Sequence, residues 1–153
     1  MTVTLEANGS VQLKARSEIV SIGAGVVINN VSLPGAGEYD IAGIQADVRP
    51  AGNALAYFVY TEELLTIYLD TPALEVTDLS NAENCNVFIL DLRSDSSTDT
   101  VKVLIKRLEP SYVVLIGATP EVLTEIGLPT QTGTLKVTRS GLPLEGTTIL
   151  TRE

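Results

Sequence analysis

The chain contains no histidine. Histidine is the side chain that proteins use most often as a transition-metal ligand and as a general base near neutral pH. Its absence excludes Ser-His-Asp and Cys-His nucleophile systems and every histidine-containing zinc site. The single cysteine, Cys85, excludes a cysteine-only zinc site and an internal disulfide as well. We therefore expect no cofactor, and the residues favour a protein that is not an enzyme.

Basic and aromatic residues are also scarce. Ten Lys and Arg against nineteen Asp and Glu give a net charge of −9, and there are two Phe, five Tyr and no Trp. Nucleic acids and anionic membranes attract clustered positive charge, so we expect neither as a partner. No segment reaches the roughly eighteen apolar residues of a membrane-spanning helix, and the start, MTVTLEANGS, is unlike a signal peptide. Together with the lone cysteine, these features predict a cytoplasmic protein.

The residues that are present predict one domain over residues 1–153. The first half consists of short segments rich in Val and Ile, with Gly and Pro between them. The predicted strands are residues 2–7, 10–15, 18–23, 25–33, 39–50, 54–61 and 62–70. NGS and TEE at two of the junctions predict hairpin turns. Segment 54–61 is apolar on both faces, which predicts a central position in a sheet.

The second half has a different pattern. Segments 86–92 and 112–118 are continuous apolar runs typical of buried strands. Between them, apolar residues recur at helical spacing until Pro110, so residues 86–118 predict a β-α-β unit with parallel strands. Residues 119–127 predict a short helix that begins at Thr119 and ends at Gly127. Segments 134–141 and 147–152 predict two terminal strands, paired as a hairpin. The expected fold class is α/β (α+β): a β-sandwich of mixed sheets with outer helices.

An ordered series of segments resembles the metallo-β-lactamase fold, in its subgroup of small zinc-dependent hydrolases. LPGAGEYDIAGIQADV (33–48) is similar to the family's GPGEYEVxGV segment, and residues 53–70 are similar to the hairpin that follows it. NCNVFILDL (84–92) and VKVLIKRLEPSYVVLIGA (101–118) resemble the family's next strand and its last helix and strand. Residues 3–16 are similar to its opening hairpin. The resemblance implies a truncated metallo-β-lactamase-like domain.

The zinc ligands of that family do not carry over. Its His-x-His-x-Asp-His motif should precede the GEY segment, but only SEIVSIGAGVVINNVS (17–32) stands there. The family's last histidine falls at about Gly117, and Asp70 is the nearest match to a further ligand. A hydrolytic zinc ion needs about three protein ligands, so Asp70 alone cannot retain it. The resemblance therefore implies a degenerate member.

Several residues are candidates for a site, and each also has a purely structural explanation. Asp70 is a metal-ligand candidate, or it caps the turn after a strand. Glu38, Tyr39 and Asp40 are ligand-binding candidates at a glycine-rich loop, or Tyr39 simply packs there. Thr119 stands at the helix start in GATPE, a possible anion site or an ordinary N-cap. The aspartate-containing segment 91–99 lacks calcium-loop spacing, and Cys85 has no basic neighbour to activate it.

These observations favour a non-catalytic domain that works by binding or self-assembly. A mean hydropathy of +0.25 predicts apolar surface hidden in a homo-oligomer. The alternative is a carboxylate-only metal-dependent hydrolase, built on Asp70 with Asp40, Asp47 or Asp91. A third possibility is a small-molecule pocket lined by residues 34–40 and 117–121.

Overall fold

The computed structural model describes residues 1–52, 54–70, 79, 84–94 and 97–152. The smaller sheet contains β1 (Thr2–Leu5), β2 (Val11–Ala15), β3 (Glu18–Ile22), β4 (Val26–Ile28), β5 (Val31–Ser32) and β13 (Thr134–Lys136). The larger sheet contains β6 (Gly37–Ile41), β7 (Ile44–Ala51), β8 (Ala54–Thr61), β9 (Leu64–Leu69), β10 (Cys85–Asp91), β11 (Tyr112–Ile116), β12 (Thr130–Thr132) and β14 (Thr148–Thr151). The helices are α1 (Thr98–Leu108), α2 (Pro120–Ile126) and a 3₁₀ turn, η2 (Arg139–Gly141).

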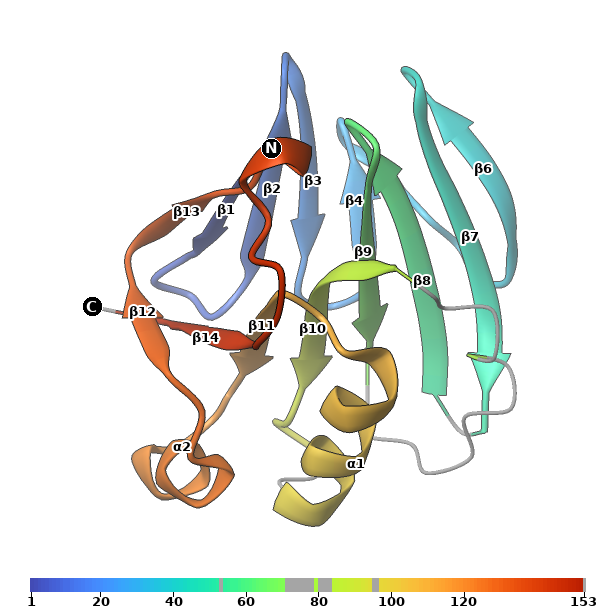
Figure 1. Ribbon diagram of the computed structural model, residues 1–153. Helices are drawn as coiled ribbons and strands as arrows, with labels where there is room; N and C mark the ends of the chain where they lie inside the picture. Colours follow the sequence, from blue (N-terminus) through green and yellow to red (C-terminus); the bar gives the residue numbers. More distant parts are fainter. Residues whose placement is uncertain (53, 71–78, 80–83, 95–96, 153) are drawn as a thin grey trace.

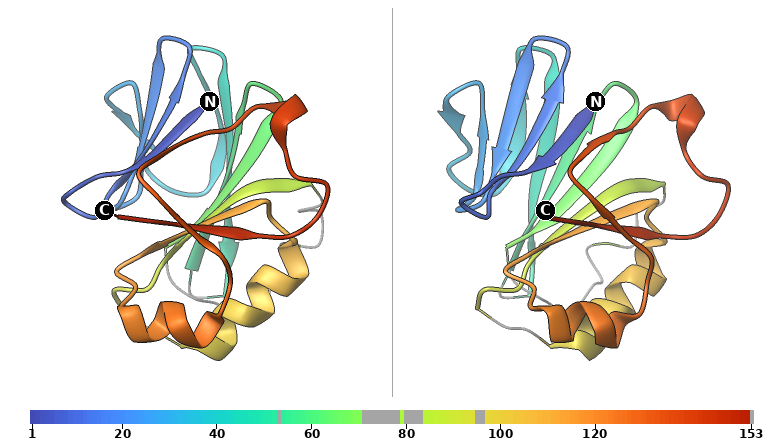
Figure 2. Two further views of the ribbon diagram at one scale, coloured as in Figure 1. Left: turned by 60° about the vertical axis from the view of Figure 1, so that its left-hand side comes forward. Right: turned by 90° about the vertical axis from the view of Figure 1, so that its left-hand side faces the viewer.

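The two sheets pack face to face, and both α-helices lie on the outer side of the larger sheet (Figure 1, Figure 2). The smaller sheet is antiparallel, in the order β13-β1-β2-β3-β4-β5. The larger sheet has the order β12-β14-β11-β10-β9-β8-β7-β6. Its strands β6 to β9 are antiparallel, whereas β9, β10, β11, β14 and β12 run parallel. The expected sandwich of mixed sheets with outer helices is confirmed.

Two apolar cores follow from the alternation of side chains along the larger sheet. On β10, Val87 and Ile89 face the smaller sheet, whereas Phe88 and Leu90 face the helices. All four are fully buried, which explains the continuous apolar run in the sequence. Burial of each such side chain contributes about 1.5–3 kcal/mol relative to an exposed position.

The helices form where local signals predict them. The buried residues of α1 include Val101, Leu104, Ile105 and Leu108, the predicted apolar stripe. At the start of α2, the Thr119 hydroxyl accepts a hydrogen bond from the Val122 amide at 3.4 Å. That helix ends at Gly127, where a φ of 70° suits glycine. With 11 and seven residues, neither described α-helix is long enough to cross a membrane.

Three strand predictions were wrong. Residues 39–50 do not form one strand, because Ala42 and Gly43 have φ values of 53° and 84° and turn the chain between β6 and β7. Positive φ at both central residues is the geometry of a tight hairpin turn. Residues 25–33 do not form one strand, because Asn29 and Asn30 have φ values of 46° and 69° and turn the chain between β4 and β5. The terminal segments do not form a hairpin either: β13 pairs with β1 in the smaller sheet, whereas β14 lies between β11 and β12 in the larger one.

The remaining strand predictions are confirmed. Segment 54–61 is β8, with β7 and β9 on either side, and Glu62 and Glu63 form the turn that leads into β9. Strands β10 and β11 are parallel neighbours. The turn predicted to follow Asp70 and the middle of the aspartate-containing segment 91–99 lie outside the described residues.

Candidate functional site

The carboxyl ends of three parallel strands meet at one edge of the larger sheet. Leu69 of β9 is in register with Leu90 of β10, and Asp91 of β10 is in register with Ile116 of β11. Asp70 and Gly117 directly follow these strand ends. Carboxyl ends of parallel strands are the usual place for ligands in α/β sheets, so this edge is the expected position of a site.

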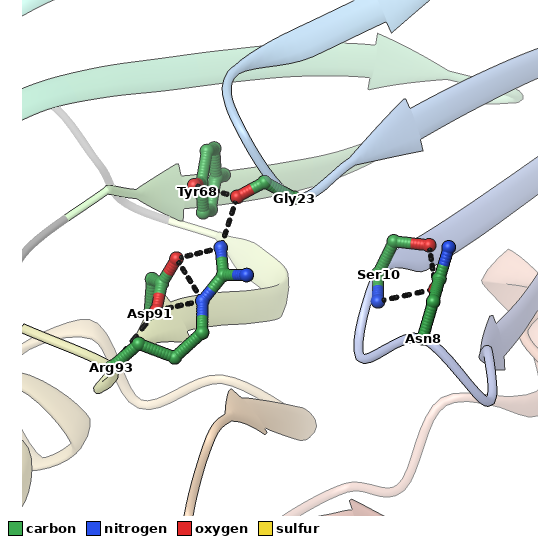
Figure 3. A network of polar contacts seen from close by, with 6 residues as sticks. All are labelled: Asn8, Ser10, Gly23, Tyr68, Asp91 and Arg93. Carbon is green, nitrogen blue, oxygen red and sulfur yellow. Dashed lines mark hydrogen bonds and ion pairs between the residues drawn. The ribbon is translucent and has the colours of Figure 1, made fainter.

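Arg93 occupies this edge (Figure 3). Its Nε donates hydrogen bonds to both carboxylate oxygens of Asp91, at 3.0 and 3.1 Å, and its Nη2 donates to Asp91 Oδ2 at 2.5 Å. Nη2 also donates to the carbonyl oxygen of Gly23, between β3 and β4, at 2.5 Å. The guanidinium therefore ties the larger sheet to the smaller one through a charge-assisted contact.

Asp91 is the buried partner in this pair. Its side chain is 9% exposed, whereas that of Arg93 is 51% exposed. The backbone amide of Arg93 donates to Asp91 Oδ1 at 2.9 Å, so both carboxylate oxygens have partners. The hydrogen bonds with Asp91 are the main cause of a raised pKa for the Arg93 guanidinium, which stays charged. The carboxylate thus accepts from a permanent cation.

Two tyrosines line the same inter-sheet space. The rings of Tyr57 and Tyr68 lie 5.3 Å apart, and the Tyr68 hydroxyl donates to the Gly23 carbonyl at 3.3 Å. Burial, followed by the charges of Asp91 and Asp70, raises the pKa of Tyr68. Burial, followed by the charge of Asp70, also raises the pKa of Tyr57. Both phenols are therefore neutral at physiological pH and do not supply a general base.

Gly117 marks the position that the family resemblance assigns to its last histidine. A Cβ atom built there would lie 2.6 Å from Cγ of Arg93, and the φ of Gly117 is +79°. Both the contact and the backbone conformation favour glycine. The Arg93 side chain thus fills the space into which a larger residue at this position would extend.

Asp70 accepts a backbone hydrogen bond at the end of the β8–β9 pair. Its Oδ1 accepts a hydrogen bond from the Leu55 amide at 2.9 Å. Asp70 and Asp91 end neighbouring strands, but the described residues contain no group of three or more Asp, Glu, Cys or His that could hold a metal ion. With no imidazole, and with both carboxylates already bonded, the donor set does not fit the zinc site implied by the resemblance.

The other acidic candidates lie on a different face. Glu38 and Asp40 point away from the smaller sheet and line a depression of about 490 Å³ together with Asp47. Asp47 pairs there with Arg49, whose Nη2 lies 2.5 Å from Oδ2 of Asp47. The structure therefore does not bring Asp40 or Asp47 to Asp70.

Two further candidates have structural partners. The Tyr39 hydroxyl donates to the Gly35 carbonyl at 2.7 Å, and the Thr119 side chain caps α2. Among the described residues, the hollow beside residues 117, 118 and 120 is lined by none of residues 34–40, so it is not the pocket expected from both segments. Burial raises the pKa of the Cys85 thiol to about 12, which agrees with an inert cysteine.

Sequence reasoning missed Arg93. The available signal was its position two residues after Asp91, at the end of a predicted parallel strand. Polar residues at such strand ends often belong to sites. What the pattern did not contain is the contact with Gly23, which is 70 residues away in the chain.

No protein-family model matches this chain, and no curated protein matches it in sequence. Its structure is similar to a crystal structure from Thermotoga maritima, described as that of a candidate zinc-dependent hydrolase of the metallo-β-lactamase superfamily. The alignment covers 100% of both chains with a TM-score of 0.74. This protein has a metallo-β-lactamase-like fold. At 8% sequence identity the similarity extends to the fold alone.

Proposed function

We propose that this metallo-β-lactamase-like domain is not a hydrolase and that it acts by binding or self-assembly. The observation that carries the proposal is the position of Arg93, bonded to Asp91 and Gly23 at the carboxyl edge of the larger sheet. A guanidinium has no lone pair with which to ligate a metal, and its positive charge repels a divalent cation.

The groups around Arg93 support the same conclusion. Tyr57 and Tyr68 have raised pKa values and stay protonated, and the chain has no histidine. Activation of water near neutral pH requires a bound metal or a base of suitable pKa. The described part of this edge offers neither a histidine base nor three free metal ligands.

Metal analysis tests the proposal directly. The protein is purified without a metal-affinity step, and its zinc, iron and manganese contents are measured by mass spectrometry. Thermal unfolding is then recorded with EDTA and with added zinc. We expect metal far below one equivalent and a midpoint that changes by less than about 1 °C, because a tightly bound ion would stabilise the native state. Stoichiometric metal together with turnover of an ester, amide or phosphodiester would refute the proposal.

The alternative, a carboxylate-only metal site around Asp70, has weaker support. Asp40 and Asp47 line the depression on the outer face, which leaves Asp70 with Asp91. Both remaining carboxylates accept hydrogen bonds from the protein, and Asp91 is paired with a cation. Stabilisation by Ca²⁺ or Mg²⁺ that is lost in Asp70→Asn would favour this alternative.

Self-assembly stays a prediction. The large apolar side chains that are exposed lie on separate elements: Ile19, Val31, Tyr60, Val103 and Leu144. Scattered exposed apolar residues are ordinary on protein surfaces, so they do not mark an interface. Gel filtration with light scattering tests this part, and a monomer at micromolar concentration would confine the proposed role to ligand binding.

A further inference from the structure

A hollow of about 370 Å³ lies beside Arg93, between the β1–β2 turn, the start of α2 and the end of β14. This volume lies within the range of about 300–1000 Å³ that is usual for small-molecule sites. Two of the ten basic residues of the chain, Arg93 and Arg152, line the hollow, and among the described residues no acidic side chain lines it. In a protein with a net charge of −9, this local excess of positive charge calls for an explanation.

The Arg93 guanidinium has N–H donors that are free to bind a ligand in the hollow. Its Nε and Nη2 are bonded to Asp91 and Gly23, but Nη1 makes no hydrogen bond with the described residues. Figure 3 shows Nη1 directed away from Asp91, toward the side where Asn8 and Ser10 lie. Asn8 and Arg93 both line the hollow. The ion pair with Asp91 thus holds the guanidinium in place while one nitrogen faces the hollow.

Arg152 supplies a second, unengaged cation. It is exposed, and within the described part of the chain its side chain forms neither an ion pair nor a hydrogen bond. The helix start nearby is already occupied: Thr119 caps α2, and hydrogen bonds from its own backbone and from Thr119 lower the pKa of Glu121. The arginines, and not the helix end, are therefore the groups available to an anion.

Apolar residues supply part of the remaining wall of the hollow. Its walls include Leu5, Leu115, Ile116, Ala118, Leu123 and Leu150. A ligand that matches both the arginines and the apolar wall has an anionic head and a compact apolar body. Within the described part of the chain, the charges of Arg93, its partner Asp91 and Arg152 sum to +1, which balances a singly charged head better than a doubly charged phosphate. A guanidinium also matches the planar, two-oxygen geometry of a carboxylate.

We propose that this hollow binds a small organic monocarboxylate, with the carboxylate on Arg93 Nη1 and Arg152 and the apolar body against the leucine-lined wall. This inference names a ligand class for the binding role proposed above. The metal measurements remain a separate test, since a protein that lacks both metal and carboxylate binding would refute only the inference about the hollow.

The test is a titration of ¹⁵N-labelled full-length protein with hexanoate, followed by amide chemical shifts in NMR spectra. Hexanamide serves as the uncharged control, and inorganic phosphate tests the alternative anion. With hexanoate we expect saturable chemical-shift changes at Gly9, Gly117 and Ala118. Hexanamide and phosphate should each bind at least about tenfold more weakly. Hexanamide lacks the negative charge that strengthens the hydrogen bonds to arginine, and phosphate carries more negative charge than the two arginines and Asp91 balance.

Two matched variants locate the binding. Arg152→Gln should weaken hexanoate binding about tenfold or more, whereas Arg107→Gln, on the exposed end of α1, should change it less than about twofold. No saturation by about 10 mM, roughly tenfold above a dissociation constant of 1 mM, would overturn the proposal. Equal binding of hexanamide, tighter binding of phosphate, or an equal loss in Arg107→Gln would also overturn it.

Discussion

Removal of the Arg93 guanidinium should destabilise the protein, and Arg93→Met is the variant that tests this. Methionine keeps much of the apolar stem but leaves Asp91 without its cation. The carboxylate of Asp91 is only 9% exposed and would retain one hydrogen bond, from the amide of residue 93. A buried charge that loses its partner is destabilising, because the group has already given up its hydration.

The magnitude follows from the burial of the two groups. Loss of one partner from a fully buried pair costs about 3–5 kcal/mol, whereas exposed pairs contribute about 0–1 kcal/mol. Arg93 is 51% exposed, so solvent screening places this pair between the two limits. We expect Arg93→Met to lower the free energy of unfolding by about 2 kcal/mol, roughly 4–8 °C in the melting temperature of a chain of this size.

The assay is urea unfolding followed by circular dichroism, since the chain has no tryptophan. Arg107→Met provides the matched control, because Arg107 is exposed on the last turn of α1 and should change stability by less than about 0.5 kcal/mol. Adding Asp91→Asn to Arg93→Met should recover part of the loss, because no buried charge remains. An Arg93→Met protein within about 0.5 kcal/mol of the wild type would refute this account of the edge.

Three further predictions concern other elements. Asp70→Ala should cost about 1 kcal/mol in urea unfolding by removing the acceptor of the Leu55 amide, whereas Asp70→Asn should cost clearly less; equal costs would contradict this role. Leu104→Ala on α1 should cost about 2–5 kcal/mol, and Val103→Ala, at a 49% exposed position, under about 1 kcal/mol; similar losses would show that α1 does not pack as described. Cys85, with its pKa raised to about 12, should not react with a disulfide reagent at pH 8 until urea unfolds the chain. The thiol ionises near pH 9 in the unfolded chain but only near pH 12 in the native protein. Cys85 should therefore lower the free energy of unfolding by up to about 1.4 kcal/mol per pH unit as the pH rises from 9 to 12. The same dependence of the free energy of unfolding on pH in Cys85→Ala would contradict this.

Most elements were predictable because their signals are local. The apolar stripe of α1, the Thr119 cap and the Glu62–Glu63 turn each occupy a few neighbouring residues. The Ala42–Gly43 turn was missed because its flanking residues continue the alternation of a single strand. The partners of β13 and β14 were missed because they depend on sheets formed by distant parts of the chain.

The candidate site was less predictable than the fold. Thr119 is the predicted N-cap, whereas Asp70 accepts a hydrogen bond from Leu55 on the neighbouring strand, and the turn it was expected to cap lies outside the described residues. The grouping of Asp70 with Asp40 or Asp47 does not hold, because strand alternation places those two carboxylates on the outer face. Distance along the chain carries no information about which face of a sheet two remote residues share.

By itself, the amino-acid sequence determined which chemistry is missing and which segments become strands and helices. A chain without histidine cannot build an imidazole-ligated zinc site in any fold, and periodicity acts over a few residues. Only the tertiary structure decided what stands at the carboxyl edge instead. Arg93 reaches across the sandwich to Gly23 and packs against Gly117, and such contacts exist only after both sheets have come together.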